Sequence, residues 1–195
     1  MKAFKMFNKD MTCTMGRGKF QYEIGKTYRE EEANCRRNGF HCAENPLDCL
    51  NYYHSFENSV CCEVDARGSI DEDDHDSKIS CTEIEIKRKL SLESFVVQSA
   101  NYIANHPKMP RNERVKTSPS KVTENHFVIV CCGKPAAKGK LGDVICCIEE
   151  RECEQDGEKM QVIGHIGVYS IDGKVHKPDT WYGYDGKEVV PDEES

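Results

Sequence analysis

Residues 39–53, GFHCAENPLDCLNYY, predict a strand, a helix cap and a helix in close succession. The segment 39–42 is typical of the end of a strand. Asn45 is a favourable N-cap, because its side-chain oxygen accepts a hydrogen bond from a backbone N–H of the first helical turn. Pro46 follows at the first helical position, where the missing N–H costs nothing. The sequence therefore predicts a helix that begins at Pro46.

This helix is expected to be amphipathic. Leu47, Leu50 and His54 recur at helical spacing, and Cys49 and Tyr53 widen the same buried face. Polar groups of the same stretch are then left to line a pocket beside the helix. The candidate pocket residues are His41, Asn45, Tyr52 and Tyr53.

The composition is that of a soluble protein. The chain has 195 residues, a formal net charge of -7 and 31% charged residues. No apolar run approaches the roughly eighteen residues that a membrane helix needs, so we expect no contact with a membrane. The opening MKAFKMFNKD lacks the apolar centre of a secretion signal. We therefore expect the protein in the cytoplasm.

Hydrophobic periodicity predicts an α+β fold in two modules. Residues 1–105 are expected to form a mixed or antiparallel sheet with two helices, the second over 92–105. A linker or surface loop is predicted over 106–125, because three prolines and no apolar periodicity occur there. Residues 126–195 are expected to form a small antiparallel β module, with Asp-Gly hairpin turns at 172–173 and 185–186.

Four segments carry a resemblance to a known family. KAFKMFNKDM, FQYEIGKTY, GFHCAENPLDCLNYY and GKVHKPDTWYGYDGKEV are similar to an uncharacterised family encoded largely by bacteriophages and prophages. The resemblance covers about 1–105 and 134–190, and it brings no established activity. It implies a phage accessory protein in the cytoplasm of a bacterial host, with a host or phage protein as partner. Inhibition of a host defence system is one role that such proteins have.

The twelve cysteines do not predict a metal site or a disulfide framework. The nearest approach to a zinc site is Cys35, His41, Cys42 and Cys49, but these residues are more widely spaced than the tight pairs that zinc sites use. Six other cysteines form adjacent pairs inside apolar strands, where neighbouring side chains point to opposite faces. The sequence indicates that these cysteines serve as small apolar residues.

A second hypothesis is binding of NAD. A strand that ends in Gly-Phe-His, followed by a capped helix that ends in tyrosine, resembles the NAD-binding half of ADP-ribosyltransferase-like folds. In that comparison Tyr52 or Tyr53 would stack on the nicotinamide. Glu83 and Glu85 lie on a suitable late strand, but nothing in the sequence singles out either as the catalytic acid. We therefore expect no cofactor and favour a protein that is not an enzyme.

A third hypothesis is binding of nucleic acid through a basic segment. Eight basic residues occur over 108–140, against two acidic ones. They are Lys108, Arg111, Arg114, Lys116, Lys121, Lys134, Lys138 and Lys140. Such charges contact phosphates, but only one aromatic residue accompanies them and a positive linker is ordinarily just solvated. The preferred hypothesis is a non-enzymatic protein-interaction module, with this segment as a candidate interaction surface.

Overall fold

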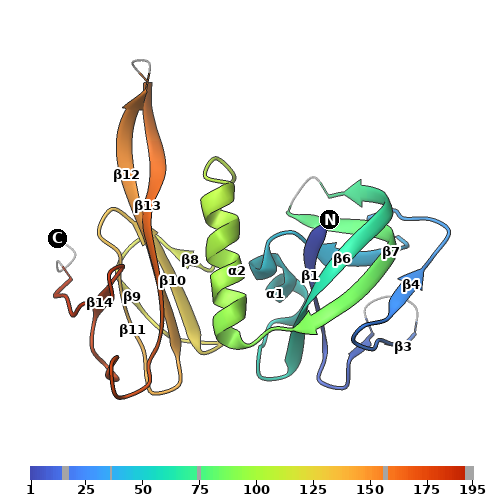
Figure 1. Cartoon of the computed structure of the whole chain (residues 1–195), viewed down its shortest axis with the longest axis horizontal. Helices are drawn as coiled ribbons and strands as arrows, with labels where there is room; N and C mark the ends of the chain where they lie inside the picture. The colour runs from blue at the N-terminus through green and yellow to red at the C-terminus, as the bar shows by residue number, and fades with distance from the viewer. Residues whose placement is uncertain (15–17, 36, 74–75, 156–157, 192–195) are drawn as a thin grey trace. The chain divides into compact units, whose positions relative to one another are not determined.

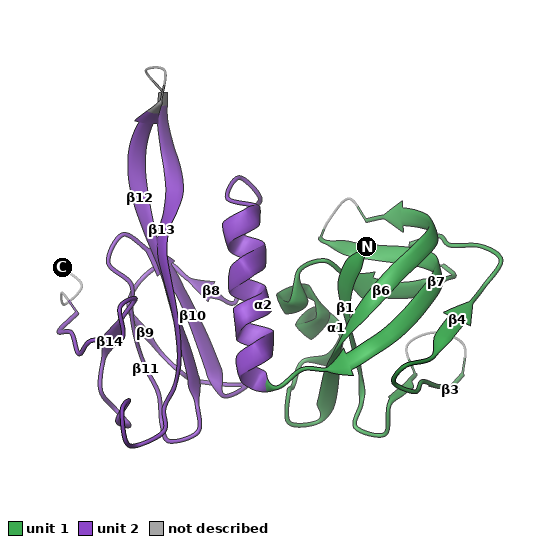
Figure 2. Cartoon of the chain, viewed as in Figure 1, with its two compact units in different colours: residues 1–91 green, residues 92–195 purple. Residues whose placement is uncertain are grey.

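The computed structural model describes residues 1–14, 18–35, 37–73, 76–155 and 158–191 (Figure 1). The chain forms two compact units, Met1–Ser91 and Leu92–Ser195 (Figure 2). The boundary therefore falls before the second helix, whereas the sequence prediction placed it in 106–125. Among the described residues, no helix has the length and the apolarity needed to cross a membrane. The predicted fold class is confirmed, since the chain is mostly β with two α-helices and mixed sheets.

Four strands of the first unit close into a small barrel (Figure 1). These strands are β1 (Lys2–Asn8), β5 (Phe40–Ala43), β6 (Ser59–Glu72) and β7 (Lys78–Lys89). Both β1 and β7 pair with β5 and with β6, so the ring has no open edge. A further strand, β4 (Thr27–Arg29), joins the edge of β7 beside β5. The strands β2 (Thr12–Cys13) and β3 (Phe20–Gln21) form a separate pair.

Apolar side chains fill the barrel, because successive residues of each strand point alternately inward and outward. Ala3 and Phe7 of β1 lie in this core with Cys62 and Val64 of β6. The alternation places Lys5 on the same face of β1 as Ala3 and Phe7. A charged residue is therefore carried toward the interior of the barrel, where it is 7% exposed.

Most of the cysteines are buried and serve as small apolar residues. All twelve are free thiols. Adjacent members of a pair point to opposite faces of a strand, and both Cys61 and Cys62 of β6 are fully buried. The same holds for Cys146 and Cys147 in the second unit. This burial agrees with the interpretation drawn from their apolar neighbours.

The helix predicted to begin at Pro46 does begin there. It starts as a 3-10 helix, η1 (Pro46–Cys49), and continues as a single turn of α-helix, α1 (Leu50–Tyr53). The Asn45 side chain accepts a hydrogen bond of 3.1 Å from the backbone N–H of Leu47, which confirms the predicted cap. His54 ends α1 in a left-handed conformation, with φ of 48°.

In the second unit, the helix predicted over 92–105 is confirmed as α2 (Leu92–Asn105). It packs on a four-stranded sheet, with the Phe95 ring edge-on to that of Phe127 at 5.6 Å. In order across the sheet, the strands are β13 (Glu158–Ser170), β12 (Val144–Gln155), β10 (Phe127–Cys132) and β8 (Val115–Lys116). A second, three-stranded sheet contains β14 (Tyr182–Gly183), β11 (Ala136–Lys138) and β9 (Ser120–Lys121).

The second unit is mixed rather than wholly antiparallel. β10 runs parallel to β12 and to β8, and β9 runs parallel to β11. The chain passes through β11 between β10 and β12, so these two strands point the same way. The segment 106–125, predicted as a linker or surface loop, contributes β8 and β9. Each is two residues long, which is too short for a visible apolar period.

Candidate functional site

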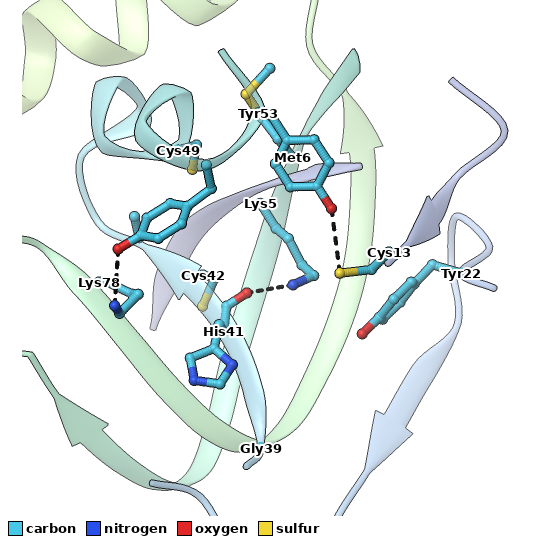
Figure 3. Close-up of a pocket in the computed structure, with 12 residues that line it drawn as sticks. Lys5, Met6, Cys13, Tyr22, Gly39, His41, Cys42, Cys49, Tyr53 and Lys78 are labelled. Atoms are coloured by element: carbon cyan, nitrogen blue, oxygen red, sulfur yellow. Dashed lines mark hydrogen bonds between the residues drawn. The ribbon is translucent and has the colours of Figure 1, made fainter. Parts of the chain in front are cut away.

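The first unit contains a cavity of about 370 Å³. Its walls come from β1, β2, β5, η1, α1 and β7, together with Tyr22 after β3 (Figure 3). Segments far apart in the sequence therefore meet at this cavity. The volume lies within the range of about 300–1,000 Å³ that is typical of small-molecule sites.

Three of the four candidate pocket residues line this cavity. His41 comes from β5, and Tyr52 and Tyr53 come from α1. Asn45 is not among the lining residues: it is 5% exposed and caps η1 through its hydrogen bond to Leu47. The same amide lies 3.4 Å from the carboxylate of Asp48. Asn45 thus holds the helix that carries the two tyrosines.

Lys5 is one of the cavity residues that the sequence did not predict. Its ammonium donates a hydrogen bond of 2.6 Å to the backbone carbonyl of His41 (Figure 3). It also lies 5.7 Å from the ring centroids of both Phe7 and Tyr22, a distance typical of a cation–π contact. In the part of the chain that the structure describes, Lys5 forms no ion pair with a carboxylate.

Lys78, the second lysine of the cavity, has a different environment. Its ammonium pairs with Asp73 at 2.8 Å and donates a 2.9 Å hydrogen bond to the hydroxyl of Tyr52. The Tyr52 hydroxyl donates in turn to Asp76 at 3.2 Å. Burial opposes the charged form of Lys78, but the bonds to Asp73 and Tyr52 outweigh it, so the pKa of Lys78 is raised. The charge of Lys78 is therefore compensated within the protein.

The acidic run DEDDHD, residues 71–76, supplies this compensation. Glu72 ends β6, and the Asp73 side chain is only 4% exposed where it meets Lys78. Residues 74 and 75 of the run lie outside the described residues. At least one acid of the run is thus a buried ion-pair partner rather than a solvated charge.

Three other ionisable groups of the cavity, His41, Cys42 and Cys49, have pKa values shifted in the direction that favours the neutral form. Burial, followed by the positive charges of Lys5 and Lys78, lowers the pKa of His41 from its ordinary value of 6.5. Burial raises the pKa of the Cys49 thiol to about 12. The pKa of Cys42 is also raised, by its hydrogen bond with Cys81 and by burial. None of these thiols is poised as a thiolate nucleophile.

Tyr53 closes one side of the cavity through a contact with β2. Its hydroxyl donates a hydrogen bond of 3.3 Å to the Cys13 sulfur (Figure 3). Burial is the main cause that raises the pKa of Tyr53, so the phenol stays protonated. Cys13 is half-buried, which places it between the cavity and solvent.

The glutamates considered as a transferase acid do not line the cavity. Glu83 and Glu85 lie on β7 and form ion pairs with Arg67, at 3.6 and 2.9 Å. Both are 20% exposed on their side chains. Among the residues that line the cavity in the described structure, there is no aspartate or glutamate.

The described residues contain no group of three or more His, Cys, Asp or Glu side chains that could hold a metal ion. Of the four residues considered for zinc, His41, Cys42 and Cys49 line the cavity. Cys35 instead donates its backbone N–H to the side chain of Asp71 and its thiol to the Asp71 carbonyl.

The basic residues of 108–140 are spread over several elements of the second unit. Arg111 pairs with Glu150, and Arg114 lies 3.5 Å from Glu113. Lys138 lies over the Trp181 ring at 4.8 Å. The others are exposed: Lys108, Lys116, Lys121, Lys134 and Lys140. Arg114 and Lys116 line a small hollow of about 50 Å³, whereas Lys134 lines a larger one of about 600 Å³.

Comparison with known proteins identifies a family for the first unit. A family model described as a domain of unknown function, DUF7666, matches residues 1–98. This range includes the whole first unit, with every residue of the cavity wall. Neither the curated proteins nor the solved structures contain a match. The matched range is half of the 195-residue chain, and the chain therefore belongs to the DUF7666 family.

Proposed function

We propose that this protein is a non-enzymatic binding protein whose first unit holds a small organic molecule in the cavity beside Lys5. The observation that carries the proposal is the cavity itself. It has the size of a small-molecule site, and donors from separate strands and helices converge on it. The DUF7666 match includes all of its wall, which supports a role that belongs to the family domain.

Several features favour binding over catalysis. The Cys42 and Cys49 thiols have raised pKa values and the imidazole of His41 has a lowered one. A nucleophile would need an adjacent base and a depressed pKa, and a transferase would need an acid at the cavity. Glu83 and Glu85 pair with Arg67 instead. NAD remains one ligand to include in a test.

The motifs similar to phage and prophage proteins also suggest where the protein acts. We propose that it is a phage accessory protein of the bacterial cytoplasm that acts on a host or phage partner. Inhibition of a host defence system is the role that we propose for it there. Capture from an infected bacterial lysate, with and without ligand, tests this setting separately from the cavity.

A second candidate function is protein interaction through the second unit. β12 pairs with β10 only as far as Glu149, but its pairing with β13 continues to Gln155. The end of this hairpin is therefore a two-stranded arm (Figure 1). Cys153 and Met160 face each other on it and are half-buried. Isolated two-stranded hairpins are marginally stable in water, so a bound protein would stabilise the arm.

The binding proposal is tested by thermal unfolding with a panel of small organic fragments, NAD and a short DNA duplex. A ligand at a hundred times its Kd adds about 2.7 kcal/mol of stability. We expect at least one fragment to raise the Tm of the wild type and of Cys153→Phe, a matched control outside the cavity. The rise should be lost in Cys13→Phe, because the larger ring enters the cavity from its wall.

A panel in which no fragment stabilises the wild type would refute the binding proposal. Stabilisation by NAD that is lost in both His41→Ala and Tyr53→Ala would favour the transferase hypothesis. Stabilisation by the duplex that falls with salt would favour nucleic-acid binding.

A further inference from the structure

We infer that the ligand of the first unit is a small organic carboxylate with an apolar body, and that its carboxylate binds the ammonium of Lys5. This inference rests on the proposed function and gives the chemical class of the ligand. It is carried by the juxtaposition of one buried, uncompensated cation with a cavity wall that is mostly apolar and whose other cation, Lys78, already has a counter-ion.

The Lys5 ammonium has few hydrogen-bond acceptors around it. An ammonium has three N–H donors, and Lys5 directs one of them to the carbonyl of His41. The aromatic rings of Phe7 and Tyr22 add only cation–π contacts. At 7% exposure, water supplies little of the remaining solvation. Burying a charge without a counter-ion is unfavourable, so a bound anion would be strongly favoured at this position.

Lys78 differs from Lys5 because it has a counter-ion. Both lysines line the same cavity, but Lys78 has Asp73 as its counter-ion and the Tyr52 hydroxyl as a further acceptor. The protein thus gives one ammonium a counter-ion and a hydroxyl acceptor, and it gives the other a single carbonyl. The acceptor missing at Lys5 is the group that a ligand would bring.

The number of donors sets the type of anion. One lysine matches one carboxylate, whereas a pyrophosphate would call for several donors or a helix N-terminus. The N-terminus of η1 is already capped by Asn45. The nucleotide class therefore fits this cavity less well than a monocarboxylate does.

The other residues of the cavity wall indicate the chemistry of the rest of the ligand. Met6, Cys42, Ala43 and Cys49 present apolar or neutral surface, since both thiols are held protonated. The rings of Tyr22 and Tyr53 add faces on which a flat group would pack. An aryl or short aliphatic carboxylate combines these features.

The test compares carboxylates with amides of the same shape by titration calorimetry. The probes are benzoate, phenylacetate and indole-3-acetate, each with its primary amide. In the wild type we expect the best carboxylate to bind at least about tenfold more tightly than its amide, because only the carboxylate compensates Lys5. The preference should persist in Lys2→Met, an exposed lysine of the same strand. It should fall to about one in Lys5→Met.

Equal affinities of acids and amides in the wild type would overturn the inference, as would a preference that persists in Lys5→Met. Binding of amides alone would leave the proposed function intact while refuting the carboxylate class. If neither acids nor amides bind, the inference fails, and the wider fragment panel decides the proposed function. Unfolding curves of Lys5→Met without ligand show whether the variant is folded.

Discussion

The cavity of the first unit and the basic segment 108–140 of the second both present positive charge, but in opposite ways. The segment has eight basic side chains, of which five are exposed and two pair with glutamates. The cavity has two, and one of them, Lys5, is buried without a carboxylate partner among the described residues. By the number of charges, the segment is the stronger candidate for binding an anion. By the energetics of a buried charge, the cavity is the stronger one.

This difference shows that burial determines how strongly a charge interacts with a ligand. Two charges 4 Å apart interact by about 1 kcal/mol in water but by about 4 kcal/mol at an effective dielectric constant near 20. Salt screens exposed charges further. A single buried lysine therefore discriminates among ligands more strongly than a run of solvated ones.

The largest effect is expected from breaking the compensated pair in the cavity wall. Asp73→Ala leaves the Lys78 ammonium buried without its counter-ion, which should lower the free energy of unfolding by about 3 kcal/mol. Glu113→Ala, which breaks the exposed pair with Arg114, should cost less than about 0.5 kcal/mol. Urea unfolding of both variants measures the contrast. Equal losses would mean that burial does not separate the two regions.

A smaller effect of opposite sign is expected from Lys5→Met. Replacing a buried, uncompensated ammonium by an apolar side chain of similar length should raise the free energy of unfolding by about 1 kcal/mol. Lys116→Met, at an exposed position of the basic segment, should change it by less than about 0.5 kcal/mol. A large loss of stability in Lys5→Met would assign Lys5 a structural role and count against its role as a ligand contact.

The pH dependence of stability should report the burial of His41 and the positive charges around it. Burial, Lys5 and Lys78 lower the pKa of His41 in the folded state, while Asp73 opposes them. The unfolded state therefore binds a proton at higher pH than the folded state does. The contribution of His41 is complete above its unfolded value of 6.5 and is lost as the pH falls through its folded pKa.

His41→Gln should consequently flatten the decline of Tm below about pH 6.5, relative to the wild type. Thermal unfolding across this range measures the slope. An unchanged slope in the variant would show that other groups cause the decline, and a steeper one would reverse the sign assigned to His41.

The smallest effect is expected from neutralising exposed lysines of the basic segment. Lys108→Gln, Lys121→Gln and Lys140→Gln should each change stability by less than about 0.5 kcal/mol. Small-ligand binding at the cavity should be unaffected. Loss of a captured protein in the triple variant would instead place a partner interface on this segment.

Local rules predicted much of the fold. The cap at Asn45, the start at Pro46 and the helix of 92–105 follow from side-chain chemistry and period within a few turns. The closure of the barrel does not, because it depends on β7 pairing with both β5 and β6. The parallel strands of the second unit depend likewise on long-range order, which no local period encodes.

The site was predictable only in part, because some of its residues lie in one local stretch and others come from distant strands. His41, Tyr52 and Tyr53 lie in one dense stretch, and the structure brings all three to the cavity. Lys5 and Lys78 come from strands that precede and follow that stretch. Alternation places Lys5 opposite Phe4 and Met6, the face that the sequence alone suggests is buried. Both faces of β1 are buried in fact, because Ala3 and Phe7 lie in the barrel core and the strand also contacts η1 and α1.

The most direct test of the account is NMR mapping of a bound probe on the wild-type protein. Titration with phenylacetate should shift the amide signals of residues around Lys5 in β1, His41 in β5 and Tyr53 in α1. It should leave those of Lys116 and Lys121 unchanged. Saturable shifts confined to the cavity residues are the predicted result. Shifts confined to 108–140 would contradict the claim that the cavity is the functional site, and the absence of any shift would contradict the assignment of its ligand to the carboxylates.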